Sequence, residues 1–243
     1  MHHLVLERWS RAHSVLHARD PRAKILLLLA FLIAVATTPR ISLASVLCYA
    51  CVLLVGISLG RLPAGAILAR AAVVLPFSAT FALLSILAGD RERALALLVK
   101  SYFSALAVLL LAAVTPLPKL LRGLESLGAP RILTLVVQFL YRYLFVISEQ
   151  AQHMRLAALC RGLGSRARGR GRMGFQAAAG AVAVLFARSY ARAQGIHRAM
   201  LARGFQGRTE LLSAPHIGTV DGLFLFFGLV LLLGLRLFLE VFR

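Results

Sequence analysis

Long apolar runs separated by short polar turns dominate the first half of the chain and return at its end. A helix that crosses a bilayer needs about 20 apolar residues. Five segments meet or approach this length, and they lie at residues 25–38, 41–59, 72–88, 94–115 and 217–239. Asp20 and Pro21 precede the first, and this order is typical of a helix start. The pattern predicts an all-α membrane protein with about five transmembrane helices.

The polar stretch between the fourth and fifth spans also has helical signals. Pro116 and Pro118 open a short amphipathic element that runs through Leu127 and is closed by Gly128 and Pro130. Two long helices are predicted at about 131–161 and 174–203, joined by a glycine- and arginine-rich loop. The expected organisation is an N-terminal segment, four spans, a helical cytoplasmic domain and a last span with the C-terminus, at residues 1–24, 25–115, 116–216 and 217–243.

Two further apolar stretches, residues 132–147 and 175–187, lie inside this polar region. If the first crossed the membrane, the arginine-rich run 161–172 would lie on the outer side, against the preference of basic residues for the cytoplasm. Arg142 would also enter the hydrocarbon, at a cost of about 2.5–3.5 kcal/mol. We therefore expect both stretches to form helices at or beneath the membrane surface.

Composition and charge support this picture and orient it. The chain is 60% hydrophobic with a mean hydropathy of +0.82, which excludes an ordinary soluble domain. Lysine and arginine number 28, against 9 acidic residues. Five basic residues cluster before the first span: Arg8, Arg11, Arg19, Arg22 and Lys24. Basic residues prefer the cytoplasmic side of a membrane, so the N-terminus is expected in the cytoplasm.

The two long helices of the polar region are predicted to end in the same way. One ends Cys160-Arg161-Gly162 and the other Ala202-Arg203-Gly204, each followed by an apolar residue. Glycine after the last turn favours a left-handed C-cap, and a terminal arginine suits the helix dipole. Ordinary capping explains this pattern. The alternative is that both arginines contact carboxylates of a partner, since the guanidinium pairs with them bidentately.

The chemistry of that partner follows from the surrounding charge. Residues 116–208 contain fifteen basic residues and only Glu125 and Glu149 as acidic ones. A nucleic-acid binder would place aromatic platforms among the basic side chains. The available aromatic residues are Phe175, Phe186, Tyr190 and Phe205. Most of them have the spacing of residues in a helix core, so no nucleic-acid partner is expected. Membrane lipid and an acidic protein surface remain as partners.

These features together resemble the transmembrane T component of energy-coupling factor (ECF) importers, of the CbiQ type associated with cobalt uptake. Residues 14–24 are similar to the family's lead into the first span, with Asp20-Pro21-Arg22 at its centre. The paired arginine motifs resemble the family's two Ala-Arg-Gly signatures. Cys160 departs from the usual alanine, but it is small and apolar, so Arg161 keeps its expected contact.

The resemblance implies a non-catalytic coupling subunit in the bacterial plasma (inner) membrane. Its expected partners are two cassette ATPase subunits, contacted by residues 160–162 and 202–204, and a small membrane subunit that binds the substrate. The chain contains no Gly-Lys-Ser/Thr phosphate loop, so ATP is expected on the partners, with no cofactor in this chain. Cobalt is the favoured substrate, and nickel or a vitamin are the alternatives.

Two other functions, secondary transport and metal binding, would depend on a few ionisable residues. A secondary transporter that works without ATP needs charged residues along a membrane pathway. The spans offer only Lys100 and Asp221 at marginal positions, and Arg236 is expected to pair with Glu240 one helical turn later. His13 and His17 stand four residues apart, yet no nearby carboxylate or thiolate completes a metal site, so none is expected.

Overall fold

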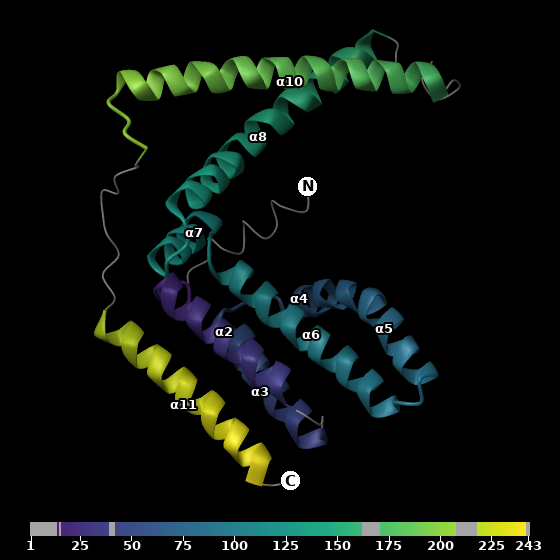
Figure 1. The fold of residues 1–243 in the computed structure, drawn as a ribbon, viewed down its shortest axis with the longest axis vertical. Coiled ribbons are helices and arrows are strands. Elements are labelled where there is room, and N and C mark those ends of the chain that lie inside the picture. The colour runs from purple at the N-terminus through teal and green to yellow at the C-terminus, as the bar shows by residue number, and fades with distance from the viewer. Residues whose placement is uncertain (1–13, 15, 39–41, 162–170, 208–217, 242–243) are drawn as a thin grey trace. The chain divides into compact units, whose positions relative to one another are not determined.

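The computed structural model describes residues 14, 16–38, 42–161, 171–207 and 218–241, and the regular structure in them is helical (Figure 1). The expected all-α membrane fold is therefore confirmed. Contacts divide the chain into two compact units. The first, the span unit, comprises residues 1–134 and 215–243, and the second, the long-helix unit, comprises residues 135–214.

The span unit contains a series of apolar helices and one short amphipathic helix. In chain order these elements are α2 (Pro21–Thr37), α3 (Leu43–Leu59), α4 (Ala64–Ala71), a 3₁₀ turn (Ala72–Val74), α5 (Leu75–Leu87), α6 (Arg91–Val114), α7 (Leu117–Ser126) and α11 (Thr219–Val241). The long helix α8 (Arg131–Cys160) begins in the span unit and continues into the long-helix unit, which also holds α10 (Gly171–Ala202).

Within the described residues, four helices are long and apolar enough to cross a membrane. They cover Ala64–Leu87, Arg91–Val114, Arg131–Cys160 and Thr219–Arg236. The apolar helix α3 is shorter, and α2 has 17 residues. Because α8 qualifies by length and composition alone, the prediction that residues 132–147 lie at the membrane surface stays a prediction.

The predicted span 72–88 is the second part of a longer helical run. This run begins at Ala64, so Arg70 lies inside a helix. A 3₁₀ turn separates α4 from α5, and Pro76 stands in the first turn of α5. Proline has no N–H to donate, so a change of helix type just before it lets the run continue past that position.

Helix α2 lies in the centre of the span unit, with α6, α7 and α11 packed against it. Its Phe31 ring meets Tyr49 of α3 edge to face, with 5.7 Å between the ring centroids. Helix α11 comes so close to α2 that a Cβ at Gly228 would clash with the Leu27 side chain. Glycine at this position therefore allows the first and last spans to pack directly together.

The C-terminal end of α2 is held by side chains from three other helices. Lys100 of α6 donates from Nζ to the Ala36 carbonyl at 3.0 Å and to the Thr38 carbonyl at 2.7 Å. The Tyr49 hydroxyl lies 2.9 Å from Thr38 Oγ1, and Arg236 of α11 donates to Thr37. The two Lys100 contacts satisfy carbonyl groups at the helix end, which lacks intrahelical donors for them, and the Tyr49 and Arg236 contacts hold the threonine hydroxyls.

Candidate functional site

The end of α10 has the hydrogen-bond pattern of a Schellman C-cap. The Phe205 N–H donates to the Met200 carbonyl at 3.0 Å, and the Gly204 N–H donates to the Leu201 carbonyl at 2.9 Å. Gly204 has φ of 78°, as the sequence predicts for the residue after the helix. The cap leaves Arg203 exposed at the helix tip.

The end of α8 presents its arginine in a comparable position. Cys160 is the last helical residue, and the Arg161 N–H donates to the Ala157 carbonyl at 3.2 Å. Both Cys160 and Arg161 are exposed. The predicted cap residue Gly162 lies outside the described residues. The two arginines thus share an exposed position directly after a long helix.

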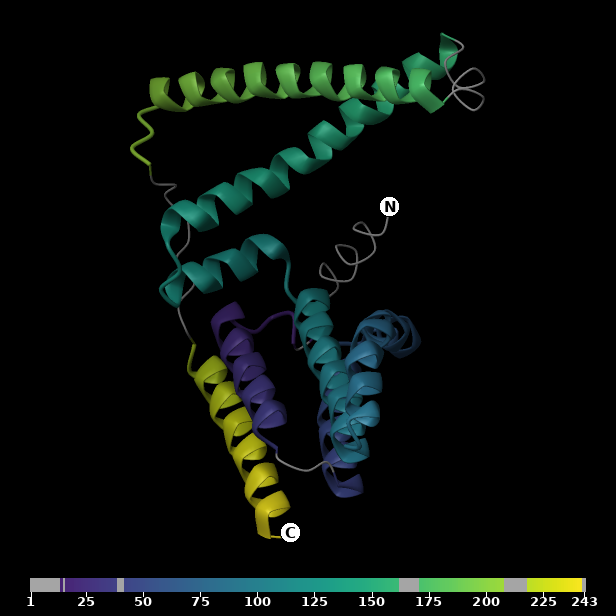
Figure 2. The same cartoon turned by 45° about the vertical axis from the view of Figure 1, so that its right-hand side comes forward.

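The long-helix unit separates these two arginines rather than gathering them into one site. The C-terminal end of α8 lies beside the N-terminal end of α10 in both views (Figures 1 and 2). Arg203 follows the opposite end of α10, which has 32 residues and is therefore about 48 Å long. The two exposed arginines therefore lie far apart in the long-helix unit.

A groove of about 470 Å³ lies between α8 and α10. Its α8 wall is formed by residues four apart in sequence, and Ser189, Arg192 and Ile196 belong to its α10 wall. Phe205 of the C-cap also lines the groove. The sequence analysis did not predict this groove. A signal for it was the apolar stripe on α8 formed by Leu135, Phe139, Tyr143 and Ile147.

The predicted N-terminal motif lies where three helices of the span unit meet. Asp20 is buried, and its Oδ1 accepts from the Arg22 N–H at 2.8 Å, which makes it the N-cap of α2. Its own N–H donates to Oδ1 of Asp221 in α11 at 3.3 Å. A Cβ at Gly123 of α7 would lie 3.2 Å from Pro21 Cβ, so α7 packs on the same turn. The motif is a junction of α2, α7 and α11.

Charged groups surround this junction. Arg19 Nη1 lies 3.9 Å from Asp221 Oδ1. Lys24 is buried just before the apolar run that begins at Ile25, outside the expected span 25–38. Burial, and after it the like charge of Lys119, lower the pKa of the Lys24 ammonium to about 8, while Asp20 acts in the opposite direction.

The ionisable residues that a secondary transporter would need have structural contacts. Lys100 and Arg236 bind the end of α2, and Asp221 contacts the residues that begin it. The expected partner of Arg236, Glu240, has a side chain outside the described part of the chain, so that ion pair stays a prediction. These contacts do not trace a path across the span unit.

The remaining candidate residues have local partners. His13 lies outside the described residues, and His17 Nδ1 lies 2.7 Å from Ser14 Oγ. Among the residues that the structure describes, no group of three or more His, Cys, Asp or Glu is placed to hold a metal ion. The Arg142 guanidinium stands 5.9 Å from the centroid of the Tyr143 ring, within the range of a cation–π contact.

Comparison with known families gives one informative match. The family model for CbiQ, described as cobalt transport protein, matches residues 12–214 of the chain. This range includes the N-terminal motif, both arginine motifs and the groove, and it ends before α11. A search of curated proteins gives no match.

Proposed function

Because the chain belongs to the CbiQ cobalt transport family, we propose that it couples two cassette ATPases to a small substrate-binding membrane subunit of an ECF-type importer. The observation that carries this proposal is the pair of exposed arginines, each directly after a long helix of a separate compact unit. The chain itself takes no part in ATP hydrolysis and works as the mechanical link between its partners.

Arg161 and Arg203 are the proposed anchors. Each reaches into a carboxylate-lined groove of one ATPase, where the planar guanidinium forms a bidentate pair. Cys160, Gly162, Ala202 and Gly204 are the small neighbours that let each helix tip approach the groove closely. The length of α10 suits two grooves on a dimer, because a single groove cannot accept both ends of a rigid helix.

The mechanism follows from rigid elements with two anchored ends. When ATP binding or hydrolysis changes the spacing of the two ATPases, the tips of α8 and α10 move with them. The long helices transmit this motion to the spans and to the substrate-binding subunit as a rigid-body switch. Residues 116–216 form the cytoplasmic coupling domain in this proposal, and the Asp20-Pro21-Arg22 junction ties its first helix to the spans.

The orientation and substrate complete the proposal. The N-terminus lies on the cytoplasmic side of a bacterial inner membrane, because basic residues precede the first span and are abundant in residues 116–208. The transported ion is cobalt, in keeping with the description of the family. Uptake of radioactive cobalt, nickel and a labelled vitamin by cells that express the complex separates the three substrates. Uptake that continues after ATP depletion would favour a secondary transporter instead.

Co-purification with the ATPase pair tests the proposed anchors. The double substitution Arg161→Ala and Arg203→Ala is expected to abolish recovery of the pair on the tagged chain. Arg188→Ala is the matched control, since Arg188 is an exposed arginine in the middle of α10. Full recovery of the ATPase pair on the double variant, at the level of the control, would sink the proposed function.

A further inference from the structure

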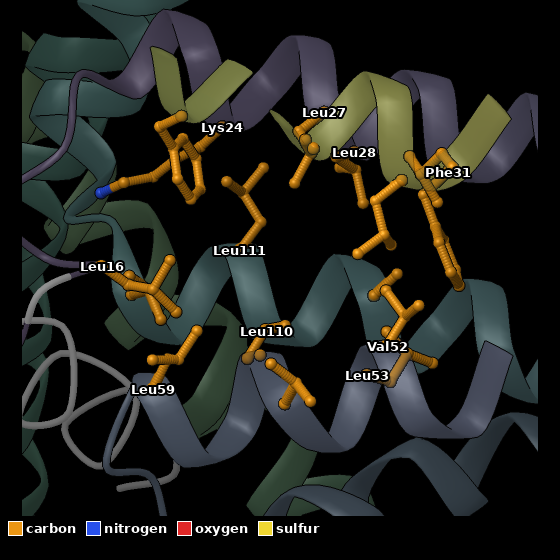
Figure 3. Close-up of a pocket in the computed structure, with 18 of the residues that line it drawn as sticks. Leu16, Lys24, Leu27, Leu28, Phe31, Val52, Leu53, Leu59, Leu110 and Leu111 are labelled. Atoms are coloured by element: carbon orange, nitrogen blue, oxygen red, sulfur yellow. The ribbon is translucent and has the colours of Figure 1, made fainter. Parts of the chain in front are cut away.

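The span unit contains an elongated, partly open cavity that the proposed coupling function does not use. It lies between α2, α3, α6 and α11 and has a volume of about 390 Å³. Figure 3 shows leucine, valine and phenylalanine side chains along its walls. Leu16 and Lys24 stand at one end, and Phe31 and Val52 stand at the other. Lys24 is the charged residue of the lining.

The Lys24 end of the cavity holds polar groups without partners. Lys24 is 7% exposed, and the charged groups that act on its ammonium are Lys119, Asp20 and Asp221. Thr115 directly follows the lining residue Val114, is 3% exposed, and its Oγ1 has no hydrogen-bond partner in the described chain. Arg19 Nε is likewise buried without one. Two buried polar atoms in this part of the span unit, Thr115 Oγ1 and Arg19 Nε, therefore lack a hydrogen-bond partner among the described residues.

Both observations indicate the chemistry of a missing ligand. A buried ammonium is costly unless an anion or acceptor pairs with it. Walls of leucine and phenylalanine offer water few hydrogen-bond partners, and an apolar cavity binds apolar molecules instead. A ligand that satisfies both ends has an anionic head and an unbranched hydrocarbon tail.

We infer that this cavity is a binding site for one anionic glycerophospholipid of the surrounding membrane. One acyl chain lies along α2 from Lys24 towards Phe31, and the phosphate faces the Lys24 ammonium. The local charge favours an anionic over a zwitterionic headgroup. Two acidic residues, Asp20 and Asp221, stand against a larger set of basic residues in this region: Arg19, Arg22, Lys24 and Lys119.

The bound lipid has a structural consequence for the last span. Helix α11 packs directly on α2 through Gly228, whereas the cavity separates part of α11 from α3 and α6. An acyl chain in the cavity completes the packing of α11 on that side. The lipid is therefore a structural ligand of the span unit, and its presence does not depend on the proposed coupling to ATPases.

Native mass spectrometry of the purified full chain tests this inference. Delipidated chain is titrated with phosphatidylglycerol or phosphatidylcholine of the same acyl composition. Wild type is expected to bind one phosphatidylglycerol tightly and phosphatidylcholine more weakly. Lys24→Gln should weaken phosphatidylglycerol binding about fivefold, the factor for one basic residue facing an anionic lipid. Arg91→Gln, which changes an exposed charge at the start of α6, should leave binding unchanged.

A second variant tests the acyl part of the site. Leu111→Trp fills the cavity and should remove the tightly bound lipid, whereas Val108→Trp, on an exposed position of the same helix, should retain it. Circular dichroism of both variants shows whether each remains folded. Equal phosphatidylglycerol binding by wild type, Lys24→Gln and a folded Leu111→Trp would overturn the inference. Equal affinity of wild type for the two lipids would overturn the anionic headgroup.

Discussion

Gly204 has a backbone conformation that L-amino acids rarely adopt. Its φ of 78° lies in the left-handed region, and the hydrogen bonds of the C-cap depend on it. The cap fixes the direction in which the chain leaves α10 and thereby places Arg203 at the tip. A residue that contacts no partner itself can therefore control how the proposed anchor is presented.

Substitution of Gly204 by alanine separates this backbone role from general helix stability. Gly204→Ala is expected to cost about 1 kcal/mol because alanine in the left-handed region is strained. Gly180→Ala, in the open interior of α10, should instead be neutral or stabilising, since alanine favours a helix. Thermal unfolding followed by circular dichroism measures both effects. Equal unfolding temperatures for the two variants would show that the cap contributes nothing.

The side chain of Arg203 makes a different prediction. Arg203→Lys keeps the positive charge but loses the planar fork that pairs with a carboxylate at two points. We expect affinity for the ATPase pair between those of wild type and Arg203→Ala, measured by surface plasmon resonance. An affinity of the lysine variant equal to wild type would mean that charge alone, rather than bidentate pairing, holds the helix tip.

At the scale of elements, helix ends were predictable from the sequence and helix neighbours were not. Helix α8 spans 131–160 against a predicted 131–161, because proline and glycine mark its limits locally. The contact of Asp20 with Asp221 joins residues 201 apart in sequence, and Lys100 reaches Thr38 across 62 residues. Such contacts depend on which helices pack together, and the apolar pattern of a span contains little information on that choice.

The same limit explains what was missed at the candidate site. Exposed arginines after α8 and α10 follow from local capping signals, so sequence alone located both tips. The groove between these helices and the cavity near Lys24 each need side chains from several elements. Lys24 directly precedes the expected span 25–38 as a charged residue, yet it is buried. Burial of this kind becomes visible only when neighbouring helices are in place.

The cap of α2 gives a prediction at this scale. Asp20→Ala removes the acceptor for the Arg22 N–H and is expected to lower the free energy of unfolding by about 1 kcal/mol. Asp20→Asn should retain most of the stability, because asparagine caps a helix about as well as aspartate. Chemical unfolding in mild detergent compares the two. If both variants lose the same stability, the charge of Asp20 rather than its cap is responsible.

The contact between the first and last spans gives another prediction at the scale of elements. Gly228→Leu places a side chain where Leu27 already lies and is expected to cost about 1–3 kcal/mol through overpacking. Gly234→Leu serves as the control, since nothing lies within 4 Å of a Cβ there. The unfolding temperature of the full chain in detergent measures both substitutions. Equal stability of the two variants would contradict the close packing of α11 on α2.

On the scale of the whole molecule, the chain divides its work between two compact units. The span unit contains most of the apolar helices, a buried junction at Asp20 and an apolar cavity. The long-helix unit presents one exposed arginine at each of two helix ends. In the proposed function the first unit holds the membrane side of the transporter, and the second receives the motion of the ATPases.

Protection of cysteines beside the two arginines tests the coupling claim most directly. Cys160 is exposed next to Arg161, and Ala202→Cys places a thiol next to Arg203, after Cys48 and Cys51 are replaced by alanine. Ala187→Cys, on an exposed position in the middle of α10, is the control. The account predicts that the ATPase pair slows maleimide labelling at residues 160 and 202 and leaves residue 187 unchanged. Labelling at 160 and 202 that proceeds at the same rate with and without the ATPases would contradict it.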